Sequence, residues 1–242
     1  MFNRGFMVFV MVLVAVSIIS SGCGNKSPEQ SVSEPVQVSQ AQAPASAQPS
    51  VDVKQEVKAA QTAVKPAQPV SQSGDSLLVA DFDAGEKPNN IGGNFGAWDK
   101  DPSDLTQGCA EAFDINNKAG DKGFGMKIDY DVDSTNPAYN GFWMFLQNLD
   151  ASMYNNLEFD VKGDQTAGFT IVFKVELKNP NEVGKYYVTG ITDQWQTIKI
   201  PLKELRGISQ FNDLTEFVIV FEDRIASNKD GVIYIDNIRF TK

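Results

Sequence analysis

Three stretches of this sequence alternate between apolar and polar residues with a period of two. They cover residues 124–132, 157–161 and 169–177. In the third stretch, one face would carry Phe169, Ile171, Phe173, Val175 and Leu177. Successive side chains of a β-strand point to opposite faces of its sheet, so this alternation predicts strands that are buried on one face only.

Further strands are expected at 77–83, 141–148, 185–191, 195–200, 216–222 and 231–240, where apolar runs are separated by turn residues. The one helical segment that we expect is a turn near 201–205. The glycine-rich stretch 90–98 is expected to be a loop beside the first strand, with Trp98 either capping the core or lining a site. About nine or ten short strands with almost no helix predict an all-β fold, a jelly-roll β-sandwich of two antiparallel sheets.

Composition excludes several classes of site. The chain has 242 residues, a formal net charge of −10 and no histidine. Without histidine there is no Ser-His-Asp triad, no Cys-His pair and no imidazole metal ligand. Two cysteines, Cys23 and Cys109, are too few for a disulfide framework or a four-cysteine metal site, and Cys109 is expected to be a buried free thiol. The acidic balance argues against nucleic acid as a partner.

Residues 1–22 have the pattern of an export signal. A positive charge near the start is followed by an apolar run that is short for a membrane-spanning helix, and small residues precede Cys23. Small residues before a cysteine resemble the lipobox of bacterial lipoproteins, although Ser20 stands where leucine is usual. The resemblance implies cleavage before Cys23 and lipidation of Cys23. Because Gly24 rather than aspartate follows, it also favours the outer membrane. The alternatives are an ordinary signal peptide and an uncleaved anchor.

The segment from the lipidated cysteine to residue 74 is expected to be a disordered linker. Residues 24–74 contain no Phe, Trp or Tyr and are rich in Ser, Gln, Ala, Val and Pro. Such a composition cannot bury enough apolar surface to offset the entropy lost on ordering. As a flexible coil it would span about 40 Å and hold the folded part away from the membrane. We therefore expect one folded domain, residues 75–242.

The strand at 141–148 is apolar on both faces, with Phe142 on one face and Trp143 on the other. Such a strand is either buried on both sides or carries a ligand platform. If Trp143 lies on the outer surface, Tyr139, Lys174 and Glu176 can flank it. A flat ring beside charged groups suits a sugar, whose C–H groups stack and whose hydroxyls form hydrogen bonds. These four residues are the predicted carbohydrate site. Strand parity alone leaves open that Trp143 belongs to the core.

A calcium site is expected near the first and last strands. Asp81 and Asp83 lie two apart and are expected on the first strand, and Asp236 lies on the last strand. These strands can be neighbours in a jelly roll, and carboxylates with backbone carbonyls suit Ca²⁺. The apolar parity changes at residues 236–237, which predicts a β-bulge there. The alternative for Asp236 is a surface residue near a turn.

Six segments together resemble the galactose-binding-like jelly rolls, and among these the family 11 carbohydrate-binding module and the complex I intermediate-associated protein 30 domain. They are Asp-Phe-Asp at 81–83, the glycine-rich 90–98, Tyr-Asn-Gly-Phe-Trp at 139–143, 157–164, 188–195 and Ile-Asp-Asn-Ile-Arg-Phe at 235–240. The resemblance implies a β-sandwich that binds β-glucan or another polysaccharide on a concave face, with a structural calcium. By position, Tyr139 and Trp143 match the aromatic strand and Asp236 matches the late acidic position.

The function that we expect first is a non-catalytic, monomeric lipoprotein of the cell envelope that binds a polysaccharide or oligosaccharide. A second possibility is a structural or assembly lipoprotein that binds another protein through the same sheet face. A third is a glycoside hydrolase with two carboxylates. No compact glutamate motif stands out in the sequence, so we do not expect an enzyme.

Overall fold

The computed structural model describes residues 72–242. The predicted export signal, Cys23 and most of the predicted linker lie outside the described residues. Within this range no helix is long and apolar enough to span a membrane.

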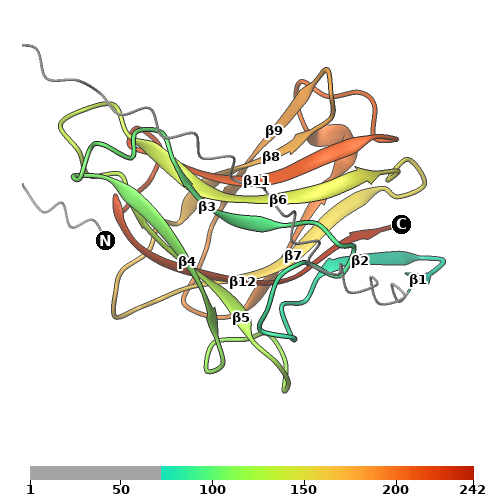
Figure 1. The fold of residues 1–242 in the computed structure, drawn as a ribbon, viewed down its shortest axis with the longest axis horizontal. Coiled ribbons are helices and arrows are strands. Elements are labelled where there is room, and N and C mark those ends of the chain that lie inside the picture. The colour runs from blue at the N-terminus through green and yellow to red at the C-terminus, as the bar shows by residue number, and fades with distance from the viewer. Residues whose placement is uncertain (1–71) are drawn as a thin grey trace, which may run out of the picture. The chain divides into compact units, whose positions relative to one another are not determined.

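Two antiparallel sheets form the domain, as the strand pattern predicts. Figure 1 shows the two layers, with β6 and β11 in the upper one and β5 and β12 in the lower one. Sheet A contains β1 (Gln72–Ser73), β2 (Ser76–Ala80), β12 (Asp230–Thr241), β5 (Gly125–Asp131) and β4 (Gly108–Asp114) in this order. It also contains β7 (Asn156–Gly163), which pairs with β12 and with β10 (Gln196–Pro201). The expected helical turn is a 3₁₀ segment at Leu202–Glu204.

Sheet B has five strands in the order β3 (Phe95–Asp99), β6 (Tyr139–Leu149), β11 (Leu214–Glu222), β8 (Val172–Lys178) and β9 (Val183–Thr189). Apart from the buried Asn140, the inner face of its three central strands is formed by apolar side chains that are at most 1% exposed. The residues concerned are Phe142, Met144 and Leu146 of β6, Phe217, Ile219 and Phe221 of β11, and Phe173, Val175 and Leu177 of β8. Burial of each such side chain is worth about 1.5–3 kcal/mol relative to exposure. This face is therefore fixed to the core, and the alternate residues must face outward.

Several expectations for the strands were wrong. No strand was expected at Gly108–Asp114, where β4 lies. Residues 95–99 form the edge strand β3 rather than a loop. Strand β2 ends at Ala80 because Phe82 has a positive φ of 52°, so Asp81 and Asp83 follow the strand instead of belonging to it. Strand β8 begins at Val172.

Phe169 and Ile171 precede β8 and do not continue its buried face. The ring of Phe169 packs over Gly163, where any side chain would collide with it. Ile171 is 50% exposed, and its N–H donates to the hydroxyl of Ser227 in a neighbouring loop instead of joining a strand ladder.

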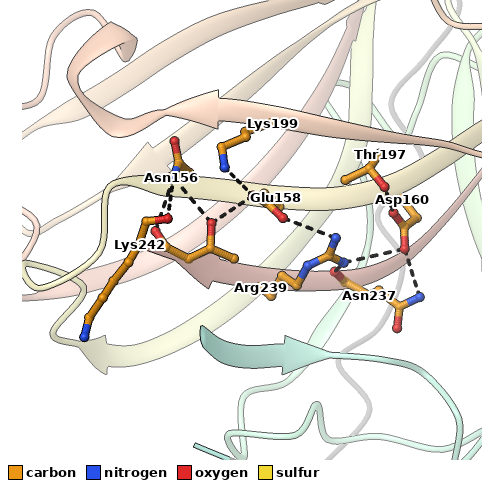
Figure 2. A network of polar contacts seen from close by, with 9 residues as sticks. Asn156, Glu158, Asp160, Thr197, Lys199, Asn237, Arg239 and Lys242 are labelled. Atoms are coloured by element: carbon orange, nitrogen blue, oxygen red, sulfur yellow. Dashed lines mark hydrogen bonds and ion pairs between the residues drawn. The ribbon is translucent and has the colours of Figure 1, made fainter. Parts of the chain in front are cut away.

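The predicted bulge in β12 is confirmed. Asn237 has a φ of 48°, and the pairing of β12 with β7 shifts between Asp236 and Arg239. Figure 2 shows the polar network that fixes this region to β7. The Arg239 guanidinium lies 3.2 Å from Glu158 and 3.5 Å from Asp160, and Asn237 donates to Asp160 at 3.0 Å. The bulge is thus held by paired charges on the outer face of sheet A.

Candidate functional site

A groove of about 370 Å³ lies on the outer face of sheet B. Its floor is formed by Val218 and Val220 of β11, which alternate with the buried Phe217, Ile219 and Phe221. Val218 is the cross-strand partner of Trp143 on one side and of Glu176 on the other. Residues in register across a sheet share a face. The sheet register therefore places aromatic side chains along one side of the groove and charged ones along the other.

The aromatic side comes from β3 and β6. Trp98 and Trp143 are half-buried, whereas Tyr139 and Phe145 are 41% and 42% exposed. The ring centroids of Trp143 and Phe145 lie 4.7 Å apart, and those of Trp98 and Tyr139 lie 5.9 Å apart. The rings thus form two contacting pairs along one side of the groove.

Glycines stand opposite both indoles. Gly96 pairs with Trp143, and Gly141 pairs with Trp98. A Cβ on Gly96 would lie 3.4 Å from the indole Nε1 of Trp143, and a Cβ on Gly141 would overlap the carbonyl oxygen of Ile219 in β11. The absence of a side chain at Gly141 thus lets β6 approach β11, whereas a Cβ at Gly96 would make ordinary contact with the Trp143 indole.

The charged side consists of ion pairs. Lys174 Nζ lies 3.1 Å from Glu176 and forms a short hydrogen bond with Glu222, and Lys178 Nζ lies 2.9 Å from Glu216. The side chains of Lys174 and Glu176 are only 11% and 13% exposed. Burial lowers the pKa of Lys174, but the hydrogen bonds that its ammonium group donates to Glu222 and Glu176 outweigh this effect, so the pKa is raised above its ordinary value. Lys174 is therefore a fixed cation and hydrogen-bond donor at neutral pH.

All four residues of the predicted carbohydrate site, Tyr139, Trp143, Lys174 and Glu176, line this one groove. Trp143 faces outward, which decides the question that strand parity left open. Whether these residues hold a sugar stays a prediction.

The sequence interpretation did not place Phe145, Lys178 and Glu216 in the site, and it left the role of Trp98 open. Lys178 could have been found from parity alone, because it continues the outward face of Lys174 and Glu176. Trp98 and Glu216 required the order of the strands in sheet B.

The three aspartates of the predicted calcium site lie near the bulge but do not form one cluster. Asp236 is 2% exposed and accepts hydrogen bonds from the backbone N–H groups of Ala119 and Asn237. Burial, with smaller contributions from the charges of Asp83 and Asp160, raises its pKa to about 7. Asp236 and Asp83 thus influence each other.

Asp81, in contrast, accepts hydrogen bonds from Asn90 and from the backbone of Asp83. Between residues 72 and 242, no three Asp, Glu, His or Cys side chains are grouped so that they could hold a metal ion. The three carboxylates therefore do not by themselves fit a calcium ion, and calcium binding stays a prediction. Cys109 is half-buried and is the free thiol of the described domain. Burial raises the pKa of its thiol well above the ordinary value.

Comparison with protein families identifies the domain. The family model described as carbohydrate binding domain 30 matches residues 94–242, a range that includes every residue lining the groove. The chain belongs to this carbohydrate-binding domain family. The sequence resemblance to carbohydrate-binding modules is thereby confirmed, and carbohydrate binding domain 30 accounts for β3 through β12. A comparison with curated proteins found no match.

Solved structures show the same fold as this member of the carbohydrate binding domain 30 family. One is a family 11 carbohydrate-binding module from Clostridium thermocellum in complex with a β-1,3-1,4-mixed-linked tetrasaccharide, with 19% identity and a TM-score of 0.52. The match covers 70% of this chain and 97% of the module. Another is the solution structure of CtCBM11, with 20% identity, a TM-score of 0.51, and coverage of 69% and 95%. At this identity the likeness concerns the galactose-binding-like jelly-roll fold.

Proposed function

We propose that the domain binds a polysaccharide chain in the groove of sheet B, without catalysis. The observation that carries the proposal is the position of Trp143 and Glu176 on either side of Val218, in a groove that combines stacking rings with fixed hydrogen-bonding charges. Because a module of the same fold is complexed with a β-1,3-1,4-mixed-linked tetrasaccharide, we propose β-glucan as the class of ligand.

The carboxylates of the groove are held by ion pairs. Glu176 and Glu222 each contact the ammonium group of Lys174, and Glu216 contacts that of Lys178. Of these three, Glu176 and Glu216 line the groove. Both are thus positioned to accept hydrogen bonds from sugar hydroxyls.

We further propose that Cys23 carries a lipid that anchors the chain to the outer membrane of the cell envelope. The small residues before Cys23 and the polar segment after it support this assignment. Mass spectrometry of the N-terminal peptide tests it. The expected result is a diacylglyceryl-modified cysteine that is absent from a Cys23→Ala variant, and an unmodified Cys23 would contradict it.

We also propose a calcium ion near the bulge, on the basis of two carboxylates. A cation shared by Asp83 and Asp236 would offset the cost of burying the carboxylate of Asp236. Thermal unfolding in EDTA and in CaCl₂ tests this at pH 8. We expect a higher Tm in CaCl₂ and no such increase in Asp236→Asn. An equal Tm in both buffers would reject the site.

Affinity electrophoresis and calorimetry test the main proposal. The full-length protein, in a detergent without a sugar headgroup, is compared on gels that contain mixed-linkage β-glucan, other soluble polysaccharides or no glycan. Retardation by a glucan together with no release of reducing sugar is expected. No retardation by any glycan would favour the protein-binding alternative, and release of reducing sugar would favour a hydrolase.

A further inference from the structure

The indole N–H of Trp98 is buried without a hydrogen-bond partner. Three side-chain polar atoms of residues 72–242 are buried and have no hydrogen-bond partner. They are Nε1 of Trp98, Oε1 of Gln107 and Oδ1 of Asn140. The other two are acceptors, so Trp98 holds the one unpaired buried donor among the described side chains. It is also the one of the three that lines the groove.

The fold itself does not require this donor. Buried polar groups are nearly always paired, and an unpaired one lowers stability. A phenylalanine would supply an aromatic ring at position 98 without the unpaired N–H. Trp143, the other indole of the groove, is not among the unpaired atoms. Residues that lower stability without contributing to the fold are concentrated at functional sites.

The ring against Trp98 is one that can move. Tyr139 contacts Trp98 edge to face, at a centroid distance of 5.9 Å and an interplanar angle of 60°. Tyr139 is 41% exposed, and on its ring lies the exposed Lys100, whose Nζ is 5.2 Å from the ring centroid. Exposed side chains change rotamer within nanoseconds. Tyr139 thus rests against Lys100 and Trp98 and is exposed enough to change rotamer.

We propose that the Trp98 N–H donates a hydrogen bond to a hydroxyl or ring oxygen of the bound glycan, and that the Tyr139 side chain changes rotamer so that this oxygen can reach the N–H. The inference rests on the proposed function and names a residue that determines specificity within the same site. The bound sugar supplies the acceptor that the free protein lacks. A site that depends on such a hydrogen bond discriminates against sugars without the matching oxygen.

Trp98→Phe tests the proposal because it keeps an aromatic ring and removes the N–H. Trp195→Phe is the matched control, because Trp195 is also half-buried but lies outside the groove. Full-length proteins in a detergent without a sugar headgroup are titrated with the β-1,3-1,4-linked tetrasaccharide by calorimetry, and their Tm is measured. We expect Trp98→Phe to have an unchanged or higher Tm and about tenfold weaker binding. Trp195→Phe is expected to bind as tightly as wild type.

A measurement on the wild-type protein does not depend on the variant folding. The three tryptophans give three indole N–H signals in ¹H–¹⁵N NMR. On addition of the tetrasaccharide, the Trp98 signal is expected to move downfield and to exchange more slowly, while the signal of Trp195, outside the groove, stays in place.

Three results would overturn the inference. They are binding by Trp98→Phe within twofold of wild type, a Tm of Trp98→Phe several degrees below that of wild type, and an unmoved Trp98 signal in saturated protein. If wild type binds none of the glycans tested, the proposed function fails and this inference with it. Binding by wild type with any of the three results rejects the inference alone.

Discussion

Trp143 on β6 and Glu176 on β8 are separated by one strand and share Val218 of β11 as their cross-strand partner. Two strand spacings correspond to about 10 Å. Above the small side chain of Val218 this separation leaves space for a sugar ring that stacks on the indole and reaches the carboxylate with a hydroxyl.

Trp143→Ala should weaken glycan binding by at least about tenfold, because truncation of a central aromatic residue removes most of its contact area. Trp143 is half-buried on the outer face, so we expect a fall in Tm of only about 2–4 °C. Trp195→Ala is the matched control, since Trp195 is also half-buried but lies outside the groove. Calorimetry with β-glucan should find its affinity unchanged, and unchanged affinity in Trp143→Ala would remove Trp143 from the site.

Lys174→Met should destabilise the domain by about 1–3 kcal/mol, because it leaves two largely buried carboxylates, Glu176 and Glu222, without their cation. Lys178→Met is the comparison, since Lys178 and Glu216 are more exposed and such a pair is worth about 0–1 kcal/mol. Urea unfolding measures both. An equal loss of unfolding free energy in the two variants would mean that the ion pairs of Lys174 stabilise the domain no more than the ion pair of Lys178.

Gly141→Ala should destabilise the domain by about 1–3 kcal/mol and weaken glycan binding. The added methyl would overlap the backbone of Ile219, so β6 and β11 must separate and the groove floor must shift. Gly74→Ala is the control, because a Cβ at Gly74 would have no atom within 4 Å. A Gly141→Ala protein with wild-type Tm and affinity would contradict the tight approach of these strands.

Acid should selectively remove the stabilising effect of Glu182. Its carboxylate accepts hydrogen bonds from the backbone and hydroxyl of Ser209, from Asn179 and from the backbone of Gln210, which lower its pKa from 4.5 to about 2. The unfolded chain therefore binds the proton first as the pH falls, so this contribution is complete above pH 4.5 and is lost toward pH 2.

Tm measurements between pH 6 and pH 2 check this expectation. Glu182→Gln should unfold at a lower temperature than wild type at pH 6, and the difference should shrink as the pH approaches 2. A difference that stays constant over this range would show that Glu182 is not tied to the segment around Ser209 in the folded protein.

Most strands could be predicted because each alternates apolar and polar residues against one packed face. The strands β3 and β4 were missed. In and just before β3, Gly92, Gly93 and Gly96 make the sequence resemble a loop. Gly96 belongs to the strand because it pairs with Trp143 of β6. A contact of this kind joins residues far apart in the chain and leaves no local signal.

The site could be predicted only in part for a similar reason. In β6 both faces are apolar, so periodicity gives the two sets of residues without saying which set faces the core. The neighbouring strand β11 determines which set faces the core. Its Phe217, Ile219 and Phe221 are fully buried, so Val218 faces outward, and Trp143 faces outward with it because the two residues are in register. The bulge at Asn237 was predictable because a change of parity within one strand is itself a local signal.

Strand β12 lies between partners that all precede it in the chain, since it pairs with β2, β5 and β7. During synthesis, sheet A can therefore be joined into one layer only after residues 230–241 have emerged, because these three strands have no shared neighbour before then. Loss of this last strand would separate β2, β5 and β7 from one another.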